Sequence, residues 1–115
     1  MSETFRKFDN NKPDMSLCPP LLMEMYARVS GMGAAKYGRN NWMNMEVKDA
    51  CRIYSACLRH LNGYTDEEGH SRGFRNGEAL DKESGLSNLD HALWQLVALK
   101  FLVNKFGYEE VMKHL

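Results

Sequence analysis

The spacing of apolar residues along the chain predicts three main helices and a short fourth one. Over residues 21–29, apolar side chains recur three or four positions apart, which places them on one face of a helix. The glycines of segment 30–33 are expected to weaken or break this helix, and residues 34–37 to form a further turn. Residues 1–20 contain a cluster of turn-forming residues and end in Pro19-Pro20, so we expect them to be irregular.

The second and third predicted helices cover residues 47–61 and 86–106. Asn62-Gly63 is expected to end the second, because glycine readily adopts the left-handed conformation found after helix C-termini. The third is apolar on nearly every side, and a helix without a polar face is buried all round. A domain of this size cannot bury such a helix alone, so we expect it to pack also against a second copy of the chain. A short helix over 108–115 completes the pattern, with Val111 and Leu115 facing inward.

No segment of strand length alternates apolar and polar residues, so the sequence predicts an all-α fold. The chain has 115 residues, which is the size of a single domain, and we take 1–115 as one domain. Its 15 basic and 15 acidic residues cancel, which argues against a protein that binds nucleic acid polymers through a strongly basic surface.

The remaining composition favours a cytoplasmic protein. The longest apolar run is Leu96–Leu99, far below the roughly 18 residues of a membrane helix. The first residues lack the apolar stretch of a signal peptide. The three cysteines have no paired spacing, which argues against a disulfide framework and a cysteine-based zinc site and favours a reducing compartment.

Charge is unevenly distributed and indicates where chemistry could occur. Seven of the 15 acidic residues fall within 66–90, and nine of the 15 basic residues precede residue 63. The glycine-rich segment 62–85 is a long predicted loop, and such loops are usually functional or disordered. A carboxylate-rich loop beside basic helices suits a phosphorylated ligand and Mg²⁺, with Arg and Lys neutralising the phosphates. The alternative is a solvated acidic loop with unrelated basic residues on the surface.

Three carboxylates in this loop are candidate metal ligands. Glu78 and Asp81 have the i, i+3 spacing that places two side chains on one face of a helical turn, and Glu83 lies close behind. Such a group can bind a metal ion that polarises a phosphoryl oxygen and activates water. The alternative is a capping role, because Glu83 and Ser84 precede the third predicted helix.

Polar residues on the second and third predicted helices are candidate ligand contacts. Arg59 and His60 end the second helix, where the helix dipole favours positive charge and where they could also contact phosphate. Asn88, His91 and Gln95 form a polar stripe on the third helix. A buried stripe needs partners, which a ligand pocket or a subunit interface could equally supply.

A further candidate group lies between the first two predicted helices. Lys36 and Tyr37 precede Gly38, and Asn41 and Trp42 follow it. Their cation, amide and flat rings can stack a nucleobase and bind its edge, or the aromatic rings can anchor the loop to the core. The four histidines lack the spacing of zinc motifs, and the sequence contains no P-loop or nucleophile elbow.

Several short motifs, taken in order, resemble a known family. They are Lys7-Phe8-Asp9 with Lys12-Pro13, Leu17 with Pro19-Pro20, Lys36-Tyr37-Gly38 with Asn41-Trp42, Arg59-His60, Gly77-Glu78 with Asp81, Glu83-Ser84-Gly85-Leu86, and His91-Ala92. Their order and spacing over residues 7–103 resemble the N-terminal domain of phage dATP/dGTP diphosphohydrolases, which is related in role to the all-α MazG-type nucleotide pyrophosphohydrolases.

The resemblance implies an all-α oligomer in the cytoplasm of an infected bacterial host. It would release pyrophosphate from purine (deoxy)nucleoside triphosphates with Mg²⁺ or Mn²⁺, through metal-assisted attack of water on phosphorus. The residues implied are Glu78, Asp81 and Glu83 for catalysis and the metal, Lys36, Arg59 and His60 for phosphate, and Asn41 and Trp42 for the base, with Tyr37, Asn88 and His91 as further candidate ligand contacts.

The carboxylate pattern leaves other functions open. MazG-type enzymes carry an E-x-x-E pair on one helix and E-x-x-D on the next, whereas here only Glu78-x-x-Asp81 matches, in a loop. A protein that sequesters a nucleotide immune signal without hydrolysing it would need the basic, aromatic and amide groups but no complete metal site. A third possibility is an interaction protein in which the helix over 86–106 mediates assembly.

Overall fold

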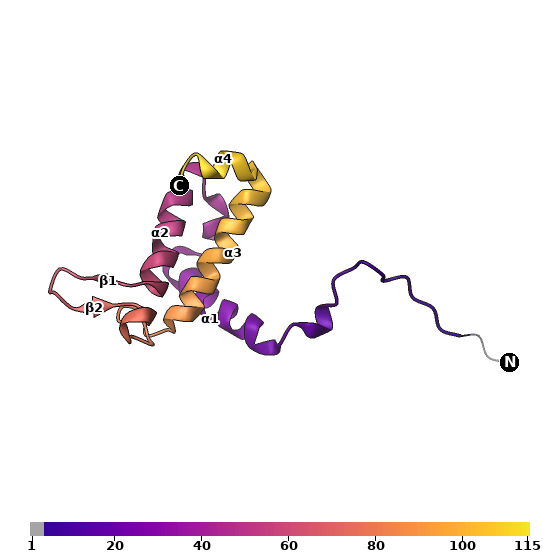
Figure 1. Ribbon diagram of the computed structural model, residues 1–115, viewed down its shortest axis with the longest axis horizontal. Helices are drawn as coiled ribbons and strands as arrows, with labels where there is room; N and C mark the ends of the chain where they lie inside the picture. The colour runs from indigo at the N-terminus through magenta and orange to yellow at the C-terminus, as the bar shows by residue number, and fades with distance from the viewer. Residues whose placement is uncertain (1–3) are drawn as a thin grey trace.

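The computed structural model, which describes residues 4–115, is built around three long helices, of which the second and third lie side by side (Figure 1). They are α1 (Pro20–Tyr37), α2 (Ala50–Leu61) and α3 (Asn88–Phe106), and a short α4 (Tyr108–Met112) follows. Helix α3 contacts each of the other three and is the centre of the bundle. The chain is therefore mostly helical, as the apolar spacing predicts.

The core lies at the end of the bundle where α4 folds back on α3 (Figure 1). Ala50, Leu102 and Val111 are almost completely buried there and come from α2, α3 and α4. Trp42 extends the core toward the middle of α3, where it packs edge-on against Trp94 and Phe101. These contacts fix α2 and the segment before it against α3, and so position the residues between them.

Helix α1 is longer than the sequence predicts, and the expected break at residues 30–33 is wrong. The helix continues through Gly31 and Gly33 to Tyr37 and ends before Gly38. Each glycine in a helix interior costs about 1 kcal/mol relative to alanine. Packing against α3 offsets that cost, because Val29 is buried and the indole N–H of Trp94 donates to Ser30 Oγ at 3.2 Å.

Helix α3 begins at Asn88 with Ser87 as its N-cap, since Ser87 Oγ accepts from the backbone N–H groups of Leu89 and Asp90. The capping role considered for Glu83 and Ser84 is therefore wrong. The helix is also not buried on every side of this chain, because Leu89, Leu96 and Val97 are 40%, 52% and 39% exposed. Their contact with a second copy of the chain stays a prediction.

The segment predicted as a loop between the second and third helices contains a small hairpin. Strands β1 (Tyr64–Thr65) and β2 (Ser71–Arg72) pair antiparallel, and a 3-10 turn over Phe74–Asn76 follows. The expected helical turn at residues 78–81 is wrong, because Leu80 instead pairs with Ser87 as an isolated antiparallel bridge. This bridge holds the segment against the start of α3.

The two ends of the chain differ in how they pack. Residues 4–14 contain no helix or strand and extend away from the bundle with Phe5 and Phe8 exposed (Figure 1). At the other end Val111 is buried as predicted, but Leu115 is 45% exposed and its expected inward position is wrong. In the part of the chain that the structure describes, no helix combines the length and apolar character needed to cross a membrane.

Replacing Gly73 by Ala is expected to destabilise the protein by about 3 kcal/mol. Gly73 has φ +100°, and a Cβ there would lie 2.4 Å from Gly63 Cα and 2.7 Å from the Arg59 carbonyl oxygen. Gly69→Ala is the matched control, because Gly69 also has positive φ (+85°) but open space around it, so only backbone strain of about 1 kcal/mol is expected. Urea unfolding of both variants measures the difference, and equal losses would contradict the close approach.

Candidate functional site

A cleft of about 1760 Å³ lies between the C-terminal half of α1, helix α2, the start of α3 and the hairpin segment. The candidate site residues came from separate parts of the sequence, yet every one of them lines this cleft. They are Lys36, Tyr37, Asn41, Trp42, Arg59, His60, Glu78, Asp81, Glu83, Asn88 and His91. The fold therefore brings the whole predicted set to one place.

Arg72 on β2 ties the hairpin to the segment that follows it. Its Nε donates to Asp66 Oδ2 at 2.8 Å and its Nη1 to Glu78 Oε2 at 3.0 Å. The side chains of Arg72, Glu78 and Asp66 are 17%, 19% and 20% exposed to solvent. Arg72 was not among the residues predicted from the sequence, because nothing in the local sequence shows that a hairpin will fold it toward Glu78.

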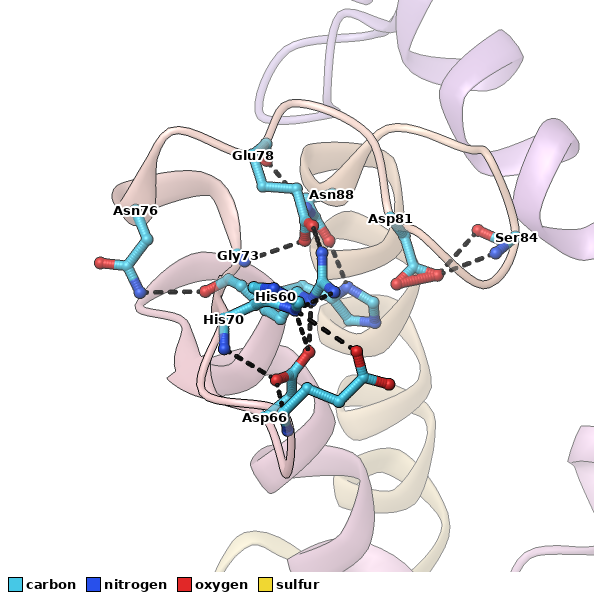
Figure 2. Close-up of polar contacts among 11 residues, drawn as sticks. His60, Asp66, His70, Gly73, Asn76, Glu78, Asp81, Ser84 and Asn88 are labelled. Carbon is cyan, nitrogen blue, oxygen red and sulfur yellow. Dashed lines mark hydrogen bonds and ion pairs between the residues drawn. The ribbon is translucent and has the colours of Figure 1, made fainter.

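The Glu78 carboxylate is held from several directions, as Figure 2 shows. Besides Arg72, the backbone N–H of Gly73 donates to Oε1 at 3.1 Å, and Asn88 Nδ2 lies 3.4 Å from the same oxygen. The Gly73 N–H, followed by Arg72 and Asn88, holds the pKa of Glu78 below its usual range. Glu78 is consequently an ionised group that joins the hairpin to α3.

Asn88 connects Glu78 to His60 through a buried amide (Figure 2). Its Nδ2 donates to the Glu78 backbone oxygen at 2.9 Å, which leaves Oδ1 as the acceptor for His60 Nδ1 at 2.7 Å. His60 therefore carries a hydrogen on Nδ1, and in the neutral ring Nε2 keeps its lone pair. Because Asn88 is only 1% exposed, this arrangement is fixed by the protein.

His60 and His91 stack face to face across the cleft wall, with ring centroids 4.4 Å apart and planes 6° from parallel. Ser84 Oγ donates to Asp81 Oδ2 at 3.0 Å, so it accepts from His91 Nε2 at 2.7 Å. Burial, and then the neighbouring charge of His60, lower the pKa of His91. The neutral ring is thus the form that the folded chain favours.

The three carboxylates expected to bind a metal ion do not face one another. Asp81 accepts from the backbone N–H and the hydroxyl of Ser84 (Figure 2), while Glu83 is 83% exposed and lies 3.4 Å from Lys36 Nζ. Within residues 4–115, no group of three or more His, Cys, Asp or Glu residues is arranged to hold a metal ion. As arranged here, each carboxylate is paired with its own partner in the chain, and the set does not fit a metal site.

Basic side chains from α1 and α2 also line the cleft. Arg59 Nη1 donates to the Ser55 hydroxyl at 2.9 Å, and no carboxylate of residues 4–115 forms an ion pair with it. Arg52 lies about two turns before Arg59 on the same helix. It also lines the cleft, and its side chain is 85% exposed. The seven-residue spacing of Arg52 and Arg59 indicates in the sequence that they share one face of a helix. Arg39 also lines the cleft, but no spacing in the sequence indicates this.

A smaller cavity of about 510 Å³ adjoins the cleft near Trp42. Tyr37, Asn41 and Arg59 line both cavities. Trp42 lines both as well, although its ring also packs edge-on against Trp94 and Phe101. Trp42 therefore does anchor its loop to the core, and it also contributes to the wall of a cavity.

Comparison with known proteins places the chain in a family. The family model described as dATP/dGTP diphosphohydrolase, N-terminal, matches residues 2–110. The chain belongs to this family. A dATP/dGTP diphosphohydrolase of Salmonella phage PMBT28 is 33% identical over 98 residues. No solved structure matches.

The match to the phage dATP/dGTP diphosphohydrolase covers 85% of this chain but 29% of the relative. The chain therefore spans less than a third of the length of that relative. The resemblance that the sequence motifs indicate is confirmed at the level of the N-terminal family, whose matched region includes all the residues that line the cleft.

In this member of the diphosphohydrolase family, His91→Gln is expected to weaken the dependence of stability on pH below neutrality. The pKa of His91 is below the value of 6.5 for an exposed histidine, so the unfolded chain binds a proton before the folded chain does as pH falls. The stability contributed by the neutral ring is present above pH 6.5 and is lost as pH decreases from there toward the folded-state pKa. Urea unfolding measured above and below this value gives the slope.

His114→Gln is the control, because His114 lies on the far end of the chain and does not line the cleft. It is expected to keep the part of the pH dependence that His91 contributes. The pKa of His91 also depends on the charges of His60, Asp81, Asp90 and Glu83. These four residues are unchanged in both variants. A pH slope for His91→Gln equal to that of the unchanged protein would show that His91 is not held neutral.

Proposed function

We propose that this chain binds purine (deoxy)nucleoside triphosphates in the cleft and takes part in their hydrolysis to monophosphate and pyrophosphate. The observation that carries the proposal is that basic, aromatic, amide and imidazole groups from α1, α2, α3 and the intervening segment line one cleft. The printed name of the similar phage protein supports the choice of substrate. Membership of the family described as dATP/dGTP diphosphohydrolase, N-terminal, also supports nucleotide hydrolysis as the proposed activity.

Arg59 is the principal phosphate contact in this proposal. Its guanidinium bonds to a neutral hydroxyl at 2.9 Å, so most of its donors remain available for phosphate oxygens. Arg52 lies on the same helix face, and Lys36 extends from α1 toward the same cleft. Arginine binds phosphate through paired N–H groups in a fixed geometry, which makes Arg59 better suited than a lysine would be.

His60 is the proton acceptor for hydrolysis. Asn88 Oδ1 accepts from Nδ1 and leaves the Nε2 lone pair available. Water would add to the α-phosphorus, the bond from that phosphorus to the bridging oxygen would break, and pyrophosphate would leave. His60 Nε2 would take the proton of the attacking water, as a positioned histidine does in general base catalysis.

The metal dependence implied by the family resemblance stays a prediction. Glu78 would have to give up Arg72 and the Gly73 N–H in order to bind Mg²⁺ or Mn²⁺, and Asp81 would have to leave Ser84. The same arrangement favours the second candidate function, in which the chain binds a nucleotide without hydrolysing it. The groups for binding are in place, whereas the carboxylates are engaged within the protein.

Arg59→Met is expected to weaken binding of dATP by about tenfold or more, because a hydrogen bond to a charged group contributes about 1.5–3 kcal/mol. Calorimetric titration in the presence of EDTA measures binding without metal-dependent turnover. Arg75→Met is the matched control, since Arg75 is exposed and does not line the cleft. Equal affinities for the two variants would remove Arg59 from the site.

His60→Gln is expected to lower the rate of nucleotide hydrolysis by about 100-fold or more while changing dATP affinity much less. The assay incubates dATP and dGTP with Mg²⁺, Mn²⁺ or EDTA and measures monophosphate and pyrophosphate. Activity that survives His60→Gln would contradict the role of His60, and turnover in EDTA would contradict metal dependence. Tight binding with recovery of intact nucleotide under every condition would establish the sequestering function instead, and absence of binding would leave a role in assembly.

A further inference from the structure

The polar stripe on α3 contains one side chain whose chemistry the proposed site does not use. Asn88 bonds to Glu78 and His60, and His91 bonds to Ser84. Gln95 is the third member of the stripe. Its Oε1 is the buried side-chain oxygen or nitrogen of residues 4–115 that has no hydrogen-bond partner.

A buried acceptor without a donor destabilises the folded chain, because its hydrogen bonds to water are lost and not replaced. The terminal torsion of a glutamine side chain has a broad energy profile, so the amide can turn its oxygen toward an adjoining cavity at little cost. Gln95 lines both the large cleft and the smaller cavity of about 510 Å³. A donor on a ligand in that smaller cavity would satisfy the oxygen.

The smaller cavity has the size of a site for a flat heterocycle, and its lining mixes polar and charged groups with some apolar surface. Ligand pockets commonly measure 300–1,000 Å³. Ile53 and Ala56 provide apolar surface, and the rings of Tyr37 and Trp42 lie at the same wall. Arg59 lies at the junction with the large cleft, so a base in the smaller cavity would have its phosphates on the basic side.

The amide of Gln95 selects among bases by the order of its donor and acceptor. It presents an acceptor beside a donor, and glutamine therefore pairs with the 6-amino group of adenine and a neighbouring ring nitrogen. Adenine carries ring acceptors on both sides of its 6-amino group, so it fits in either orientation. Guanine matches the amide through O6 and N1–H alone, because its edge with N7 and O6 has two acceptors and would leave Gln95 Oε1 facing an oxygen.

We propose that the smaller cavity is the base subsite and that Gln95 recognises the 6-amino group of an adenine nucleotide there. This inference rests on the proposed function, because it places the base of the same nucleotide whose phosphates occupy the large cleft. Gln95 is a specificity-determining residue in this arrangement. The buried oxygen is left without a partner in the empty chain and gains one when the ligand binds.

Calorimetric titration in EDTA tests the inference with dATP, dGTP and purine 2′-deoxyriboside triphosphate, which lacks the 6-amino group. The unchanged protein is expected to bind dATP about tenfold more tightly than the analogue. Gln95→Met is expected to bind these two with equal affinity. Without ligand, the same variant is expected to unfold at the same or a higher temperature, because it removes an unpaired acceptor and keeps a similar volume.

Leu96→Met is the matched control, since Leu96 is the next residue of α3, is exposed and lines neither cavity. It is expected to keep the preference for dATP. Gln95→Leu provides a second variant should Gln95→Met fold poorly. Binding of dATP with the same affinity as the analogue, or tighter binding of dGTP, would overturn the role of Gln95 while the proposed function stands. Failure of all three nucleotides to bind the unchanged protein would overturn both.

Discussion

The amide of Asn88 is the contact on which the rest of the site depends. It lies in the first turn of α3, is 1% exposed, and bonds at once to the Glu78 backbone and to His60 on α2. Through Glu78 it reaches Arg72 and hence the hairpin. One buried side chain thus joins α2, α3 and the segment between them. A buried amide tolerates only partners that complete its hydrogen bonds, so it specifies one arrangement of these elements.

The hydrogen bonds of these elements determine which charged side chains in the cleft keep donors available for a ligand. The carboxylates are neutralised by Arg72, by backbone N–H groups and by Ser84, whereas Arg59 bonds to a neutral hydroxyl. A cleft with available guanidinium groups and internally paired carboxylates attracts an anion more readily than a cation. The formal net charge of zero gives no sign of this, because the opposite charges are separated in space rather than in number.

Two independent observations underlie the proposed nucleotide ligand, namely membership of the dATP/dGTP diphosphohydrolase N-terminal family and the geometry of the cleft. The proposed nucleoside triphosphate has two chemically different ends, and the cleft offers basic side chains beside a smaller cavity whose lining mixes polar groups with the rings of Tyr37 and Trp42. The stacked pair His60–His91 joins α2, which also carries Arg52 and Arg59, to α3 at the cleft. This position connects the binding chemistry to the proton transfer that hydrolysis would require.

The sequence alone determined the helical character, the position of α2 and α3, and the types of residue in the site. Apolar spacing shows which face of each helix is buried, and the polar stripe on α3 is visible as an interruption of that pattern. It misplaced the end of α1, because packing of Val29 and Trp94 outweighs the low helix propensity of Gly31 and Gly33.

Only the tertiary structure decided what the polar residues do. The spacing of Glu78 and Asp81 indicated a common face, but Leu80 pairs with Ser87 and sends the two carboxylates to different partners. The significance of Arg72 and Gln95 likewise depends on contacts between segments far apart in the chain. Local sequence fixes the backbone preferences and the burial pattern, whereas the partner of a polar side chain is set by whichever distant group the completed fold brings within hydrogen-bonding distance.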